Sequence, residues 1–306
     1  MIRSLFVALV SVMFASGALA QNCTVPNNLT NGTNADATQV MANFNALLAC
    51  VNSPNNQNVV RGYLSGLTLS TPGSSSAFAV AQGVATSSDN TTSMQLSGAS
   101  SKTSASWVVG SGNGALDSGS IANNTWYHVY LINRPDTGVV DVCISASATG
   151  PNLTTGNIPA AYTLFRRIGS MKTNGSAQWT SFSQLGDEFL WAVAVQDSST
   201  SGAVLYGPTL SVPRGIVVWA LHNLLLINTT TADSGIVFSP GAENDPGTVN
   251  GFQRAVTGQL AAVSINAGWM QTRTDTSATI RIRVGLSTTT VIVGTRGWID
   301  RRGRDN

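Results

Sequence analysis

The sequence predicts a mainly β protein, with β-sandwich or jelly-roll-like domains preceded by a short N-terminal α-helix. Many short apolar stretches alternate with polar residues, and Gly, Ser, Asn and Pro separate these stretches at short intervals. A helical spacing of apolar residues is convincing in one early stretch alone. At 306 residues, the chain is long enough for one large or two small domains.

The composition excludes several classes of protein. Charged residues make up 10% of the chain, and 16 Lys and Arg against 14 Asp and Glu give a net charge of +2. Because so weak a field does not attract nucleic acid, no nucleic-acid partner is expected. Two His and three Cys are too few for a large metal cage, and we expect neither a metal nor a cofactor.

The first twenty residues have the pattern of a signal peptide. Arg3 precedes an apolar run at Leu5–Phe14, and the small residues Ala18 and Ala20 form a signal-peptidase site. We therefore expect a mature chain that starts at Gln21 and is periplasmic, extracellular or virion-associated. The apolar run is too short to stay in a bilayer, so no transmembrane anchor is expected in the mature chain.

Four segments are expected along the chain. They are a signal peptide (1–20), an N-terminal helical or oligomerisation segment (21–60), a β-sandwich domain (61–200) and residues 201–306. The last segment is either a second β-rich domain or a continuation of the sandwich. The boundary near residue 200 depends on Asp197–Gly202, whose Asp, Ser, Thr and Gly composition is typical of a linker.

The predicted helix is Asp36–Asn52. Asp36 is suited to cap it, and Gln39 three residues later completes a pattern like a capping box. A helix of about 16 residues is marginal alone, so its apolar stripe packs either on the chain's own β domain or on copies of itself. In the second case, the core of a homotrimer would be formed by Met41, Phe44, Leu48 and Val51.

Export also affects the cysteines. Cys23 and Cys50 flank this segment, and in an oxidising compartment they either form a disulfide or remain free thiols. Cys143 lies between Val142 and Ile144 in an extended run, so its side chain is expected to have a packing role.

The clearest β signal is a hairpin. Thr125–Asn133 is rich in aromatic and β-branched residues, Arg134–Gly138 has turn chemistry, and Val139–Ile144 forms the returning strand. Both faces of the first strand are largely apolar, which predicts a position inside a two-sheet sandwich. Further strands are expected at Tyr63–Ser70, Phe78–Ala85, Ser93–Leu96, Thr163–Ile168, Phe189–Val195, Ala203–Leu210, Ile216–Ala220, Leu224–Ile227, Ile236–Phe238, Leu260–Ile265, Thr279–Gly285 and Thr289–Gly294.

No catalytic constellation is recognisable. Asp187 and Glu188 are the one adjacent acidic pair, but neighbours on a strand point to opposite faces and do not share a substrate. Most of the seven tryptophans are expected to fill the core. Trp107 and Trp179 lie in Ser-, Gly- and Asn-rich surroundings, so we expect exposed rings there and take them as the candidate sugar-binding residues.

Three stretches carry a family resemblance: Asn31–Leu48, then Tyr162–Gly169 with Gly186–Phe189, and finally Gly297–Asp305. Together they resemble the tail-fibre-like proteins of phages and prophages of α-proteobacteria, over most of residues 22–306. The resemblance implies a trimeric, β-rich, host-facing binding module, and it brings no catalytic residues. The signal peptide departs from this pattern, because virion fibres normally assemble in the cytoplasm.

The expected function is therefore a non-catalytic host- or surface-binding module that resembles a tail-fibre tip. Its expected ligand is a surface polysaccharide or receptor. Two alternatives stay open, namely a polysaccharide depolymerase and a purely structural exported or virion protein.

Overall fold

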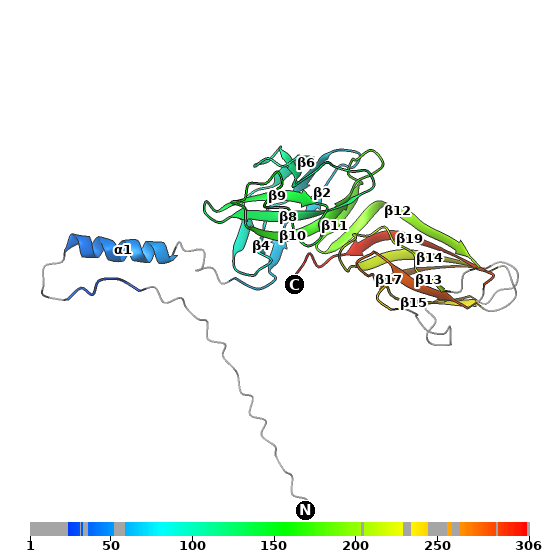
Figure 1. Cartoon of the computed structure of the whole chain (residues 1–306). Helices are drawn as coiled ribbons and strands as arrows, with labels where there is room; N and C mark the ends of the chain where they lie inside the picture. Colours follow the sequence, from blue (N-terminus) through cyan, green and yellow to red (C-terminus); the bar gives the residue numbers. More distant parts are fainter. Residues whose placement is uncertain are drawn as a thin grey trace, which may run out of the picture. The chain divides into compact units, whose positions relative to one another are not determined.

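The computed structural model describes residues 24–30, 32, 36–51, 59–202, 205–228, 234–243, 256–258, 264–285 and 287–304. The chain divides into two compact units, Met1–Asn58 and Val59–Asn306. In its described part the protein is mainly β, with a short N-terminal helix and four antiparallel or mixed sheets, one of them nearly barrel-shaped (Figure 1). The predicted fold class is confirmed. The expected signal peptide lies outside the described residues.

The N-terminal unit contains helix α1, Ala37–Val51. Asp36 caps it as predicted, since its Oδ1 accepts a 2.8 Å hydrogen bond from the Thr38 amide. Asn27 exchanges hydrogen bonds with Asn43 of the helix: the Asn27 amide donates to Asn43 Oδ1, and Asn43 Nδ2 donates to the Asn27 carbonyl, each at 2.8 Å. These bonds attach the segment 24–30 to α1.

Two sheets form the first sheet pair of the β unit. The larger is mixed, because β7 pairs in parallel with both β6 and β9. Its strands, in spatial order, are β10 (Leu164–Lys172), β8 (Trp126–Arg134), β9 (Val139–Ser145), β7 (Gly114–Leu116), β6 (Ser100–Ser106), β3 (Ala77–Val80) and β2 (Leu69–Ser70). The smaller sheet consists of β1 (Leu64–Gly66), β4 (Gly83–Thr86) and β5 (Ser93–Leu96).

The predicted hairpin is formed by β8 and β9, which are antiparallel partners. The Gly138 amide donates a 2.8 Å hydrogen bond to the Arg134 carbonyl, and Gly138 has a φ of 71°, which favours glycine. Every residue of β8 before Arg134 is buried. Val129 belongs to the main core and Tyr130 to a second apolar cluster, so both faces of β8 are covered.

The second sheet pair follows in the chain. Its five-stranded sheet contains, in spatial order, β11 (Phe182–Leu185), β12 (Glu188–Ser201), β19 (Thr289–Ile299), β14 (Trp219–Asn228) and β17 (Ser264–Arg273). Its four-stranded sheet contains β13 (Leu205–Tyr206), β18 (Ile280–Val284), β15 (Ser234–Pro240) and β16 (Val256–Gly258). The two sheets lie over one another in Figure 1.

The linker predicted at Asp197–Gly202 is wrong. β12 continues through this stretch, and Ser199 pairs with Ile292 and Thr200 with Val291 of β19. Asp197 lies at a register shift in this ladder, and its carboxylate accepts a 3.0 Å hydrogen bond from the Thr295 amide of β19. The small polar residues therefore belong to a strand with a solvent-facing side, and residues on both sides of position 200 lie in one compact unit.

The inner faces of the second sheet pair pack against each other. The even-numbered residues 220–226 of β14 are buried, and those that are apolar share one core with residues of β15 and β18. His222 lies between the sheets, with Nε2 3.0 Å from Thr272 Oγ1 and its ring centroid 5.3 Å from that of Phe238 on β15. The odd-numbered residues of β14 therefore point to the outer face of the five-stranded sheet.

Aromatic rings connect the first sheet pair to the second. The ring centroids of Trp126 on β8 and Trp298 on β19 are 5.3 Å apart, and Trp191 on β12 lies 5.0 Å from Trp298. The chain after β19 also returns to the first pair, where Arg302 Nη1 donates a 3.0 Å hydrogen bond to the Gly66 carbonyl.

Candidate functional site

Trp107 and Trp179, the predicted sugar-binding residues, are both interior. The side chain of Trp107 is 6% exposed and that of Trp179 is 0% exposed. The indole N–H of Trp107 donates to the Val142 carbonyl at 3.1 Å, and that of Trp179 donates to the Ser76 carbonyl at 2.9 Å. The expectation of exposed rings is therefore wrong, because each indole folds inward onto aromatic neighbours although the surrounding chain is polar.

The predicted helix residues belong to the N-terminal unit, whereas Cys143 belongs to the β unit. Met41, Phe44 and Leu48 are each more than half exposed on α1. Cys23 and the side chains of Cys50 and Val51 lie outside the described residues, so the disulfide stays a prediction. As the strand pattern predicts, Cys143 is a buried free thiol on β9, and burial raises the pKa of this thiol.

Trp269 is the most exposed of the seven tryptophans, with 77% of its side chain accessible. It lies on β17, at one edge of the five-stranded sheet. The strand register places Asn223 of β14 opposite Trp269, and it then places Gly294 of β19 and Gln196 of β12 further along the same row. Four strands thus contribute one row of residues across the outer face.

A hollow of about 460 Å³ lies along this row. Gly294 has no side chain between Asn223 and Gln196, and a Cβ added there would approach the Val195 carbonyl to 3.3 Å. The lining is mostly apolar with two amides and one indole: Ala194, Val195, Gln196, Asn223, Leu224, Leu225, Trp269, Ile292 and Gly294. A ligand in the hollow would meet apolar surface and amide groups together.

Arg296 holds the Trp269 ring. The guanidinium carbon lies 3.9 Å from the ring centroid, which is a cation–π contact. The ladders of β19 with β12 and β14 both shift register at Arg296, and the contact with Trp269 places its guanidinium beside the hollow. A cation–π contact at an exposed site contributes about 0.5–1 kcal/mol, which favours one orientation of the indole.

Asn223 is a polar residue in the wall of the hollow. Its Oδ1 is buried, and no donor among the described residues hydrogen-bonds to it. An unsatisfied buried acceptor costs about 1–3 kcal/mol. Asn223 and Gln196 both line the hollow, so a ligand with hydroxyl or amide groups would meet amide side chains there.

The polar groups that line the hollow are amides and an indole. Its described lining residues include no carboxylate, and glycoside hydrolysis ordinarily uses two carboxyl groups. Asp187 is engaged elsewhere, in ion pairs with Arg302 at 3.2 Å and with Arg304. Within the described ranges, no group of three or more His, Cys, Asp or Glu residues is placed to hold a metal ion.

Sequence reasoning missed Trp269, which it assigned to the core with most other tryptophans. A signal was present, because Trp269, Gln271 and Arg273 alternate with Met270 and Thr272. A strand with this alternation turns the odd-numbered side chains to one face, and Gln and Arg identify that face as the solvent side.

No protein-family model matches the chain, and no curated protein matches it either. Among the residues that the structure describes, no helix has the length and apolar character needed to cross a membrane.

Proposed function

We propose that the chain is a non-catalytic carbohydrate-binding module in which Trp269 is the main contact for a sugar ring. The observation that carries this proposal is the 77% exposed indole, oriented by Arg296 beside a hollow with two amide side chains. One face of a sugar ring is rich in C–H groups and packs on an indole, while its hydroxyls pair with amides.

The cost of the arrangement supports a binding role. Exposed apolar surface forgoes roughly 25 cal/mol for each Å² left in water, and an indole is among the largest apolar side chains. Contiguous exposed apolar patches often mark interaction sites. Trp269, Leu225 and Ile292 form such a patch, and Asn223 and Gln196 border it with hydrogen-bonding groups.

We further propose that the protein is exported and acts as a host- or surface-binding module like a tail-fibre tip. In this proposal α1 associates with two further copies of itself. Met41, Phe44 and Leu48 are each more than half exposed, and α1 contains no charged residue, so packed copies would not repel each other. A 15-residue helix gains most of its stability from burial of its apolar stripe.

An array of immobilised neutral and acidic oligosaccharides tests the proposal. The purified protein should bind a subset of the glycans, and Trp269→Ala should weaken this binding about tenfold or more, as loss of a central aromatic contact does. Leu185→Ala is the matched control, because Leu185 is also highly exposed but does not line the hollow. Equal binding by the protein and by Trp269→Ala would refute the site.

The same array separates the two alternatives. A polysaccharide depolymerase would release glycan fragments into solution, which mass spectrometry detects, whereas a binding module leaves the glycans intact. A purely structural protein would bind none of the glycans.

A further inference from the structure

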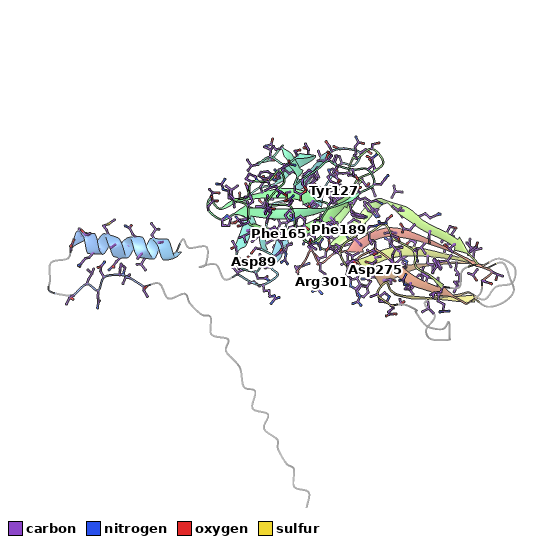
Figure 2. The ribbon with its side chains drawn as sticks, viewed as in Figure 1. Asp89, Tyr127, Phe165, Phe189, Asp275 and Arg301 are labelled. Carbon is purple, nitrogen blue, oxygen red and sulfur yellow. The ribbon has the colours of Figure 1, made fainter. Side chains whose placement is uncertain are left out.

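A second cavity, of about 720 Å³, lies where the first and second sheet pairs meet. Arg166 and Arg167 of β10 line it from the first pair, and Arg273 of β17 lines it from the second. The segment after β19 adds Asp300 and Arg301. Figure 2 labels Arg301 on this segment, close to where the chain leaves β19.

The lining of this cavity is cationic. Among its described lining residues, four are arginines and one is an aspartate. Asp300 is engaged by Arg167 through two hydrogen bonds of 2.6 Å. The charges of the described lining residues therefore sum to a positive value, which favours an anionic ligand. Guanidinium groups bind carboxylates and sulfates through paired N–H donors.

The cations are part of the cavity wall. Arg166 is 1% exposed although its guanidinium is permanently charged, and Arg167 is also buried. Their fixed charges raise the electrostatic potential of the cavity, and they do not have to move when an anion arrives. Arg273 and Arg301 are exposed at the rim, where they can meet an incoming ligand.

The remaining lining suits a sugar more than a simple ion. Ser88, Thr149 and Thr276 contribute hydroxyl groups, and Trp219 and Phe165 contribute aromatic surface. A cavity of this volume is large enough for a small organic ligand. An inorganic anion would use the arginines and would leave the hydroxyl and aromatic groups without a role.

The cavity and the Trp269 hollow share one sheet face. Arg273 is opposite Trp219 in the register, just as Trp269 is opposite Asn223. Trp269 and Arg273 are four residues apart on β17 and point to the same side, so about 13 Å separate them at 3.3–3.4 Å per residue. A single oligosaccharide can span this distance.

We propose that the cavity binds the charged residue of an anionic saccharide, whose charge is a ring carboxylate or a sulfate. Arg273 and Arg301 at the rim would pair with the anion, Trp219 would pack on the ring, and the next sugars would run along β17 towards Trp269. This inference rests on the proposed function in that the ligand is a saccharide, and it adds the chemical class of that saccharide.

The test uses uronate-containing, sulfated and neutral oligosaccharides of equal length, with the full protein. Binding is compared for four proteins: the unchanged protein, the double variant Arg273→Gln, Arg301→Gln, the variant Trp269→Ala, and the control Arg134→Gln. The control removes one positive charge from the exposed hairpin turn, away from the cavity. We expect binding of acidic oligosaccharides that weakens with salt and falls about tenfold or more in the Arg273→Gln, Arg301→Gln variant. The control Arg134→Gln should bind the acidic oligosaccharides as tightly as the unchanged protein does. The carboxylated and sulfated sets show which anion is recognised.

Three outcomes would overturn the inference. Preference for neutral oligosaccharides, with dependence on Trp269 but not on the arginines, would leave the proposed function standing and remove the anionic class. Binding of sodium sulfate with no added affinity for any sulfated or carboxylated saccharide would identify a small-anion site. If the protein bound none of the oligosaccharides, the proposed function and the inference would both be contradicted.

Discussion

The guanidinium of Arg167 holds the carboxylate of Asp300 through two parallel hydrogen bonds, Nη1 to Oδ2 and Nη2 to Oδ1, both 2.6 Å long. Both side chains are buried, and 133 residues of sequence separate them. Burial opposes ionisation of Asp300, but the nearby Arg167 charge and its hydrogen bonds outweigh that effect and lower the pKa of the carboxyl. The pair connects β10 of the first sheet pair to the chain that follows β19.

Removing the carboxylate should destabilise the β unit. Asp300→Ala would leave the Arg167 guanidinium buried without this partner, and breaking a buried pair on one side costs about 3–5 kcal/mol of unfolding free energy. Urea unfolding followed by tryptophan fluorescence measures the change. Asp136→Ala is the control, since it breaks the exposed Arg134–Asp136 pair and should leave the urea midpoint nearly unchanged. Similar midpoints for both variants would show that the buried pair does not stabilise the fold.

Two buried histidines should make the protein sensitive to mild acid. Burial lowers the pKa of His128 and of His222 from 6.5 to about 4, and the nearby Arg167 charge contributes at His128. Between pH 6.5 and 4 the unfolded chain binds more protons than the folded one, so stability falls as pH falls through this window. Each histidine should contribute a loss of about 1.4 kcal/mol per pH unit within it.

Urea midpoints measured from pH 7 to pH 4.5 test this dependence. His222→Gln should reduce the slope, because one of the two proton-linked groups is gone. A slope that is the same in this variant would mean that His222 does not carry the effect.

The burial of Trp179 predicts a structural role. Trp179→Ala should cost about 3–5 kcal/mol of unfolding free energy, as large-to-small changes of buried tryptophan do. The milder Trp179→Phe should stay folded and bind glycans like the unchanged protein. A loss of glycan affinity in folded Trp179→Phe would return Trp179 to the binding site.

The proposed α1 assembly predicts a change of mass. Phe44→Asp should dissociate the trimer, because it places a carboxylate in the apolar seam of each helix. Gln39→Glu is the control, since it adds the same charge on the other side of the helix near its N-terminus, where negative charge is tolerated. Light scattering after size exclusion gives the absolute mass. A monomer before any substitution, or an unchanged trimer in Phe44→Asp, would contradict the assembly.

Local chemistry explains why parts of the fold could be predicted. The Asp36 cap of α1 depends on one side chain and an amide two residues away, and the β8–β9 turn depends on Gly138 at a positive φ. Both are encoded within a few residues. The predicted linker at Asp197–Gly202 failed because a polar strand and a polar loop have the same composition, and pairing with β19 decided between them.

The site could not be predicted for a related reason. Trp179 and Trp269 both lie among small and polar residues, yet one is fully buried and the other is 77% exposed. An indole is amphipathic and suits either environment, so its own sequence neighbourhood does not determine its burial. The position of β17 at a sheet edge, with Gly294 two strands away, determines that Trp269 borders an open hollow.

By itself, the sequence determined the mainly β class, the capped helix and the central hairpin, because propensities, turns and alternation act over a few residues. The tertiary structure alone decided which tryptophans are exposed and that Arg166, Arg167, Arg273 and Arg301 surround one cavity. Those residues come from strands and segments far apart in the chain, and only the pairing and packing of the sheets bring them together.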